Sequence, residues 1–569
     1  MLRKIKAKSS MKISWKQYLK RFYLIREAIR CYRSILGQPD WKNKINESYF
    51  KIIKTESNEK ILIATGGGSY LSGVSIESML GLALTLRGQQ VHILMCDEVL
   101  PACFQSDIDW DRNEKKFAEN GPSAIFCSAC FKPSAKMYQS LGFTVHRISD
   151  MVSSEERIDI RKIVNDIRYK DIRYHIYDDI PVGEHAYAGT LRFYAKAELS
   201  DPFSENILRK YLEASIISTI AIKRLCKKIS FHRAVLHHGI YVPQGVFAES
   251  LIHLKIPIVT WHVAYRKETF MFSHQGTYHR TLMTEPVSIW EDIPWSEKLN
   301  NETLEYLNSR WFGSKDWIHF HRNTVFDKKI LYDKLCISKD KPYILLLTNV
   351  MWDAQLHYPN NAFNSMLEWI KYSINWFIKN PELQLVIRVH PAELTGTLPS
   401  RQLVVEEIEK EFGDLPENII LIGPENAIST YILAEDCNAA IIYGTKTGVE
   451  LAAKGVPVIV AGEAWIRNKG ISIDVNTPLE YESVLNSLPF KERMPESEII
   501  RARKYAFHFF FRRMIPLSFV KSNKHRITPF EFDIKDISEL QSGKNRGLDI
   551  ICDGIINGSP FVYNPEQFY

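Results

Sequence analysis

The chain has 569 residues, of which 45% are hydrophobic and 24% are charged, and its formal net charge is +7 at pH 7. This is an ordinary globular balance, with enough length for two large domains and sizeable cores. The mild positive excess suits an anionic nucleotide-sugar or a loose hold on an acidic membrane surface, and does not indicate nucleic-acid binding.

The chain shows neither a secretory signal nor an apolar run long enough for a membrane-spanning helix. Nine cysteines without such a signal favour free thiols in a reducing compartment. We therefore expect a cytoplasmic protein, with peripheral contact to the inner membrane as an open possibility.

Residues 1–58 are basic and aromatic, and predict a helical N-terminal extension. Within Lys16–Leu36 the apolar side chains fall near one face of a helix; they are Tyr18, Leu19, Phe22, Ile25, Ile29, Tyr32 and Ile35. Two interpretations stay open, a helix packed on the domain and a basic amphipathic helix lying on lipid.

The first domain is expected over residues 59–338. Lys60–Thr65 predicts a buried strand, Gly66, Gly67, Gly68 and Ser69 form a turn, and a helix runs to about Arg87 before the next strand. This order is typical of a Rossmann-like domain. The glycines lack the spacing of a dinucleotide-binding fingerprint, so NAD binding is not indicated.

Four cysteines follow the second strand, and two of them form the spacing CxxC. Cys96, Cys103, Cys127 and Cys130 could complete a zinc site, or they could be small buried residues near strand ends.

Histidines cluster near the ends of two later strands of the first domain. His238 follows the strand beginning at Ala234, and the segment Trp261–Arg280 is dense in His, aromatic, Arg and Glu residues. We expect this segment to be a loop at the sheet edge, where chemistry is commonly located. Glu268, His274 and His279 are therefore candidates for a catalytic base; the alternative is a surface loop with aromatic packing.

The second domain is expected over residues 339–525, after the turn-prone SKDKP at Ser338–Pro342. Its first strand, Tyr343–Leu347, leads into the loop Thr348–Gln355. A later strand, Leu385–Val389, contains Arg388 and ends at His390 and Pro391. Proline ends the strand and holds the imidazole at the sheet edge.

The central unit of this domain is Ala439–Gly462, which reads as strand, turn, helix, turn and strand. The turn contains Thr445, Lys446, Thr447 and Gly448. Backbone N–H groups at a helix N-terminus, together with the threonine hydroxyls, suit a phosphate. Glu450, near the helix start, could reach the hydroxyls of a ribose.

The pair of motifs, HP at 390–391 and TKTG at 445–448, resembles the donor-binding domain of GT-B glycosyltransferases of the capsule polysaccharide synthesis family, a group that includes Kdo transferases. The resemblance covers about residues 340–480. It implies an α/β protein of GT-B type: two Rossmann-like domains with parallel sheets facing a central cleft, here with the helical N-terminal extension.

The resemblance also implies roles for the residues quoted above. His390, Thr445 and Thr447 would contact the donor, with Arg388, Pro391, Lys446, Gly448 and Glu450 at the same site. The Gly66–Ser69 turn and His238 would face the acceptor, and Asp353 would lie at the catalytic centre. No cofactor and no obligatory metal are expected.

The C-terminal part carries a second basic aromatic helix, Glu498–Pro516. It either packs back across the first domain, as in GT-B folds, or touches lipid. Residues 526–569 show no pattern we can interpret and are expected to form an irregular tail.

We therefore predict a glycosyltransferase that uses a nucleotide-sugar donor and a saccharide or lipid-linked saccharide acceptor to build a bacterial surface polysaccharide, either capsule or lipopolysaccharide. Two alternatives remain open. One is a nucleotide-sugar epimerase of GT-B-like fold, and the other is a non-catalytic polysaccharide-binding component of an export complex.

Overall fold

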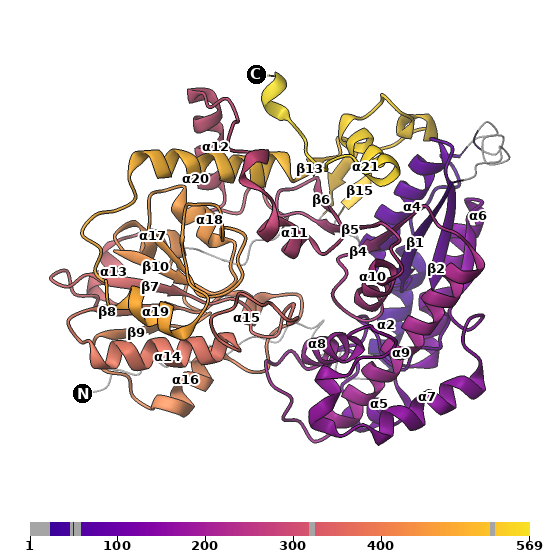
Figure 1. The fold of residues 1–569 in the computed structure, drawn as a ribbon, viewed down its shortest axis with the longest axis horizontal. Coiled ribbons are helices and arrows are strands. Elements are labelled where there is room, and N and C mark those ends of the chain that lie inside the picture. The colour runs from indigo at the N-terminus through magenta and orange to yellow at the C-terminus, as the bar shows by residue number, and fades with distance from the viewer. Residues whose placement is uncertain (1–22, 46–48, 50–58, 318–324, 524–529, 569) are drawn as a thin grey trace.

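The structure is a computed structural model and describes residues 23–45, 49, 59–317, 325–523 and 530–568. It has two α/β lobes, each built on its own sheet (Figure 1). This confirms the expected fold class. Within the described residues, no helix combines the length and the apolar character that crossing a membrane requires.

The first sheet has seven strands in the order β13-β6-β5-β4-β1-β2-β3. They are β1 (Lys60–Gly66), β2 (Gln90–Met95), β3 (Thr144–Arg147), β4 (Arg233–His237), β5 (Ile258–Val263), β6 (Thr269–His274) and β13 (Ile515–Pro516). Strands β1 to β5 run parallel to one another. At one edge β6 pairs antiparallel with β5, and β13 pairs antiparallel with β6. The buried strands are rich in Ile, Leu and Val, as expected where helices cover both faces.

Helices pack on both faces of this sheet. On one side lie α4 (Leu71–Thr85), α6 (Ala124–Ser140) and α21 (Arg546–Asn557). On the other lie α5 (Glu114–Asn120), α7 (Ser154–Asp166), α8 (Val182–Tyr194), α9 (Ser204–Lys228) and α10 (Gln244–His253).

The second sheet has six strands, all parallel, in the order β12-β11-β10-β7-β8-β9. They are β7 (Tyr343–Leu347), β8 (Gln384–Arg388), β9 (Ile419–Ile422), β10 (Ala439–Ile442), β11 (Val458–Val460) and β12 (Ile473–Asp474). The strand order reverses direction between β7 and β10. In open parallel sheets, the crevice beyond the strand ends at such a point is where ligands bind.

Helices also cover both faces of the second sheet. One face packs against α14 (Met366–Lys379), α16 (Val404–Phe412) and α19 (Pro478–Leu485). The other packs against α12 (Glu297–Ser309), α17 (Thr430–Glu435), α18 (Thr447–Ala452) and α20 (Glu496–Phe507). Short helices α11 (Tyr278–Thr284), α13 (Lys329–Asp333) and α15 (Ala392–Thr395) lie in the connections.

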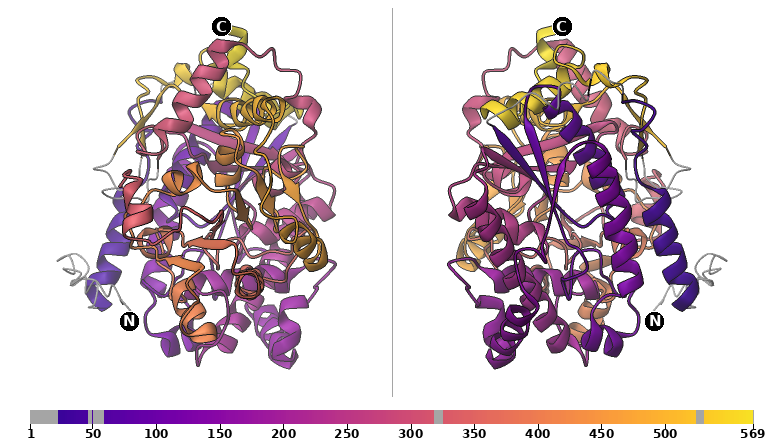
Figure 2. Two further views of the ribbon diagram at one scale, coloured as in Figure 1. Left: turned by 90° about the vertical axis from the view of Figure 1, so that its left-hand side faces the viewer. Right: turned by 90° about the vertical axis from the view of Figure 1, so that its right-hand side faces the viewer.

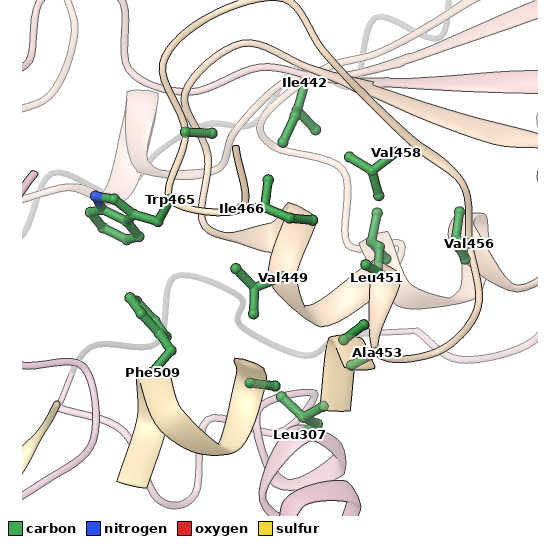
Figure 3. Close-up of a cluster of buried hydrophobic side chains, with 14 of the residues drawn as sticks. Leu307, Ile442, Val449, Leu451, Ala453, Val456, Val458, Trp465, Ile466 and Phe509 are labelled. Atoms are coloured by element: carbon green, nitrogen blue, oxygen red, sulfur yellow. The ribbon is translucent and has the colours of Figure 1, made fainter. Parts of the chain in front are cut away.

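The helix α18 of the central unit, between β10 and β11, packs tightly against these two strands. Val449 and Leu451 pack with Ile442, Val458 and Phe509 (Figure 3). A Cβ at Gly448 would lie 2.5 Å from the Ile442 side chain, so only glycine permits this close approach.

The segment Trp261–Arg280 is not the loop we expected. It forms the end of β5, a tight turn, strand β6 and the start of α11. The turn between the two strands has Glu268 at a φ of +61°. The local sequence gives no Gly, Pro or Asn signal for this hairpin.

The C-terminal part returns to the first domain. The chain passes through α20 and a short π-helical turn, His508–Arg512, and enters the first sheet as β13. Phe509, Phe510 and Phe511 are buried. This segment therefore packs back across the domains, and its alternative as a lipid contact is wrong.

We expected the C-terminal tail to be irregular, but from residue 530 onward it forms regular elements. Strands β14 (Val520–Ser522) and β15 (Phe530–Phe532) form a hairpin, and α21 packs against α4 and β4.

The helix α12, which we expected to complete the first domain, instead contacts α20 and shares the core of the second domain. The remaining domain boundaries stay predictions.

The N-terminal helix α2 (Tyr23–Leu36) packs on α6, which agrees with the first of its two interpretations. The predicted helical residues 16–22 lie outside the described part of the chain.

Candidate functional site

A pocket lies at the C-terminal ends of the second sheet's strands, beside the point where strand order reverses. The residues that line it come from the HP motif, from the TKTG motif and from further segments of the chain. The lining residues are Tyr265, Arg310, Asp316, Leu347, Thr348, Arg388, His390, Pro391, Thr430, Tyr431, Thr445, Lys446 and Thr447. Parallel strands β7, β8 and β10 end at one edge, which explains why the HP and TKTG motifs meet.

His390 is held in a defined orientation. Its backbone N–H donates to the Thr348 hydroxyl at 3.0 Å, and its Nδ1 accepts the Ala392 N–H at 3.0 Å. Because Nδ1 is an acceptor, the other ring nitrogen, Nε2, carries a proton.

The two threonines of the central turn are linked to each other. The Thr445 hydroxyl donates to the Thr447 hydroxyl at 3.2 Å and accepts the Thr447 N–H at 3.4 Å. The helix that follows is only six residues long, so its dipole is a minor contribution. Attraction for an anion here depends on the side chains.

Those side chains form a buried charge network that the sequence analysis missed. Arg310, just after α12, lies 3.0 Å from Glu450 and also pairs with Asp316; the exposed fractions of these three side chains are 5%, 1% and 7%. Lys446 lies 3.6 Å from Glu450. Two cations thus share the Glu450 carboxylate at the wall of the pocket.

The network fixes the charge states of its members. Burial opposes the charge of Arg310, yet the Glu450 carboxylate holds its pKa well above the usual value. Burial would also raise the pKa of Glu450, but Arg310 and Lys446 outweigh it and keep that pKa low. Burial lowers the pKa of Lys446, with Arg310 adding to this effect and Glu450 opposing it. Arg310 and Glu450 are therefore both charged near neutral pH.

Glu450 does not line the pocket, so the sequence interpretation of a ribose contact is not supported. Its carboxylate also accepts a hydrogen bond from the Tyr431 hydroxyl, and it orders three lining residues from behind. Arg388 does line the pocket, but its guanidinium donates to the carbonyls of Gly423, Asn426 and Ile428. Its role is to hold that loop, and a donor contact stays a prediction.

A group of aromatic and imidazole rings of the first domain lies where this domain contacts the second. His238, at the end of β4, has a φ of +28°, and its Nδ1 accepts the Ile240 N–H at 3.1 Å. Its ring lies 4.1 Å from that of His237. Burial and the neighbouring histidines push the pKa of both well below normal, so both rings are neutral.

Asp353 reaches this group from the second domain. Its Oδ1 accepts a hydrogen bond from Tyr241 of the first domain at 2.7 Å, and the Ala354 N–H donates to the same hydroxyl at 3.0 Å. Burial lowers the pKa of His262, a residue the sequence analysis did not single out, while Asp353 acts in the opposite direction. The carboxylate therefore lies among the imidazoles between the domains.

His279 also faces the space between the domains. Its ring is 4.4 Å from that of Tyr278 and 5.1 Å from that of Trp465, which belongs to the loop after β11. Burial lowers the pKa of His279 to about 3, so this ring is neutral.

The other two candidate bases lie elsewhere. His274 ends β6, which runs antiparallel to β5, so it lies at the opposite edge of the sheet. Its Nε2 bonds the Ser559 carbonyl at 2.9 Å, and its ring stacks on Phe561. The assignment of His274 to the catalytic centre is wrong. Glu268 lies in the β5–β6 turn, where its carbonyl accepts the Leu517 N–H beside the edge strand β13.

The Gly66–Ser69 turn is pinned from behind by two helices. The Ser69 N–H donates to Cys130 Sγ at 3.2 Å, its hydroxyl lies 2.7 Å from that of Ser34, and the Gly68 carbonyl accepts from Ser134. A Cβ at Gly68 would lie 2.2 Å from the Cys130 carbonyl, so glycine is required. These contacts fix the turn but use the polar groups of Gly68 and Ser69, whose acceptor role stays a prediction.

The four cysteines around this turn are free thiols. Burial raises the pKa of Cys96 to about 12 and that of Cys103 to about 11, and it also raises the pKa of Cys127 and Cys130. Among the described residues, no three His, Cys, Asp or Glu side chains are arranged to hold a metal ion. The geometry therefore favours partly buried free thiols over the zinc alternative.

Comparisons with known proteins find a family similarity over part of the chain. Residues 306–503 match the model of the family described as capsule polysaccharide biosynthesis protein. This segment contains Arg310, Asp316, His390, Thr445 and the rest of the pocket except Tyr265. No curated protein matches the chain in sequence.

Several solved structures are similar over part of their length. The Thermosulfurimonas dismutans KpsC β-Kdo 2,7-transferase is 14% identical, with a TM-score of 0.31, and the match covers 56% of this chain and 88% of that one. The β-Kdo 2,4-transferase of the same protein is 11% identical, with a TM-score of 0.33 and coverage of 55% and 87%. The UDP-GlcNAc 2-epimerase from Neisseria meningitidis is 10% identical, with a TM-score of 0.24 and coverage of 79% and 94%.

At these TM-scores the structural matches carry no argument about activity. The family match rests on the sequence itself and coincides with the second domain and its pocket. Residues 306–503 are thus similar to the capsule polysaccharide biosynthesis family.

Proposed function

We propose that this protein is a glycosyltransferase of capsule polysaccharide synthesis, and that it takes its sugar from a nucleotide-activated donor. The observation that carries the proposal is the pocket at the strand ends of the second sheet. There, His390 and two threonine hydroxyls face the same space as Lys446 and Arg310. This set suits the phosphate of a nucleotide-sugar, since a fixed imidazole N–H, hydroxyl donors and cations all favour a phosphate oxygen.

The donor phosphate is the leaving group of such a transfer. Negative charge builds up on its oxygens as the bond to the sugar breaks, and preorganised donors stabilise that charge. His390 is fixed by two hydrogen bonds and Lys446 by its ion pair, so neither has to reorganise during the reaction. This is how the pocket would accelerate the transfer.

The acceptor would enter from the first domain. Among the four catalytic candidates, Asp353 and His279 face the space between the domains, and we propose Asp353 as the group that takes the acceptor's proton or stabilises the positive charge on the sugar. The Tyr241 hydroxyl donates to its carboxylate, and the Asp353 charge acts on the pKa of the nearby His262. The carboxylate reaches into a site shaped by both domains, as a reaction between two bound substrates requires.

The test is a nucleotide screen followed by a turnover assay. Specific binding of one of CMP, UDP, GDP or dTDP should raise the thermal midpoint, because a ligand that binds only the folded state stabilises it. The matching nucleotide-sugar should then be consumed only when a saccharide acceptor is present. Conversion to an isomer without acceptor would instead show an epimerase, and failure to bind any nucleotide would favour the non-catalytic alternative.

A further inference from the structure

The N-terminal helix α2 has its polarity reversed. The residues that face the protein are Arg26, Glu27, Arg30 and Ser34, all of them buried. The residues that face solvent are mostly apolar, with Arg33 beside them: Leu24 is 78% exposed, Tyr32 61%, Ile35 51% and Leu36 59%. A helix that only packs on its domain has the opposite arrangement.

The buried contacts fix this orientation. The Arg26 Nε donates to the Trp110 carbonyl at 2.8 Å. Arg30 pairs with Asp111 at 3.3 Å, and its guanidinium lies 3.4 Å from the centre of the Phe126 ring. Rotating the helix to bury its apolar side would break these contacts and leave buried charges unpaired, which is costly. The apolar face therefore stays outward (Figure 2, where α2 is the indigo helix at the edge of the molecule).

The apolar face adjoins a basic groove. Arg26 lines both parts of this groove. The other lining residues come from the loop before α5, from α5 itself, from the start of α6 and from Pro202 and Phe203 before α9. Arg112, Lys115 and Lys116 are exposed there, and Ile125, 71% exposed, extends the apolar side chains onto α6.

The acidic groups at the groove are already engaged in the protein. Glu114 accepts a hydrogen bond from the Tyr194 hydroxyl at 3.1 Å, and Asp111 pairs with Arg30. The surface offered outward thus combines apolar side chains with a cluster of positive charge.

We infer that this surface, formed by the outward face of α2, Ile125 and the groove around Arg112 and Lys115, docks on an anionic phospholipid membrane. Apolar side chains enter the region between headgroups and acyl chains, while Lys and Arg lie at the level of the phosphates. A second copy of the chain fits less well, because a symmetric contact would bring two basic grooves together.

The helix also links this surface to the first-domain turn. At its C-terminal end the Ser34 hydroxyl contacts that of Ser69, and just beyond it Gln38 Nε2 donates to the Gly68 carbonyl at 3.3 Å. Docking would therefore place the membrane directly behind the turn expected to face the acceptor. This second step rests on the proposed function, and it names a lipid-linked saccharide as the acceptor class.

The experiment is flotation of the full chain with vesicles of phosphatidylcholine, alone and mixed with phosphatidylglycerol. The unchanged protein should float with the mixed vesicles and be released by added salt, which screens exposed charges. Leu24→Glu should weaken partitioning about tenfold, because it removes a large apolar side chain from the interface. Lys115→Glu should weaken it by about fivefold or more, the scale of one basic residue at an anionic surface.

Two substitutions elsewhere serve as matched controls. Leu479 is also 78% exposed, but lies on α19 of the second domain, and Lys491 is exposed in the segment between α19 and α20. Leu479→Glu and Lys491→Glu should leave flotation unchanged. The thermal midpoint and the nucleotide-induced shift should be unchanged in all four variants, so a failed docking surface and a failed donor pocket give different results.

Several outcomes would overturn the docking surface. They are equal recovery with neutral and mixed vesicles, equal loss in the Leu24 and Leu479 variants, and a dimer in solution that Leu24→Glu converts to monomer without any vesicle binding. If vesicles bind but lipid-linked and lipid-free acceptors are used equally well, the link to the acceptor is wrong.

Discussion

Replacing Glu450 by Gln separates two roles that this residue could have. The sequence suggests a contact with the ribose of the donor, whereas the structure places the carboxylate behind the pocket wall, 3.0 Å from Arg310 and 3.6 Å from Lys446. Gln has nearly the same shape but no charge. The substitution therefore leaves two cations without their shared counter-charge at a side chain that is 1% exposed.

The expected cost follows from this burial. Removing one partner of a buried ion pair costs about 3–5 kcal/mol, whereas exposed pairs contribute about 0–1 kcal/mol. For a domain of this size the buried value corresponds to a fall in the thermal midpoint on the order of 10 °C. Glu435→Gln is the control, because Glu435 pairs with Lys328 at 2.8 Å but is 35% exposed; its midpoint should change little.

The pH dependence gives an independent check. Arg310 and Lys446 hold the pKa of Glu450 below its ordinary value of 4.5 against the effect of burial. A carboxyl whose pKa is lowered by folding stabilises the protein above the unfolded pKa, and this stability is lost as the pH falls through the folded value. The difference between the wild type and Glu450→Gln should therefore be full at pH 7 and shrink below about pH 4.5.

Thermal and urea unfolding, followed by tryptophan fluorescence, measure these differences directly. An unchanged midpoint in Glu450→Gln together with lost nucleotide binding would refute our placement of the carboxylate. It would restore the ribose contact suggested by the sequence.

The remaining predictions concern activity. His390→Ala and Thr445→Ala should each cost about 2–4 kcal/mol of transition-state stabilisation, measured as a loss in kcat/KM for the donor, with the thermal midpoint nearly unchanged. Asp353→Asn should lower kcat at least ~100-fold with little change in nucleotide binding, the usual scale for proton transfer. His274→Gln and Glu268→Gln should retain turnover, and a loss like that of Asp353→Asn in either would reverse the assignment.

The fold could be predicted because its signals are local. The strands of the second domain are short apolar runs, each followed by a turn, and their parallel arrangement brings every strand's C-terminal end to one edge. His390 and Thr445 lie in separate strand–turn units, yet their meeting in one pocket follows from this rule alone. The family match then covers the same units.

The first domain was harder to predict where it departs from that rule. Strand β6 runs antiparallel, so its last residue, His274, lies at the edge away from the pocket, although the sequence places it near His279. The turn before it lacks the residues that commonly mark a hairpin. A local reading could not tell that the two histidines are on opposite sides of the sheet.

The charge network shows the limit of local reasoning most clearly. Glu450 lies in the first turn of a helix that follows a phosphate-type turn, and nothing in its neighbourhood tells whether its carboxylate faces a ligand or the protein. That is decided by Arg310, which follows α12, far away in the sequence, and which pairs with both Glu450 and Asp316. Leaving the Arg310 cation buried without a carboxylate would cost far more free energy than leaving a ribose hydroxyl without this hydrogen bond. With Arg310 placed there, the Glu450 carboxylate is directed inward, and we expect contact with the donor to come from the lining residues that it holds in place, Lys446 and Tyr431.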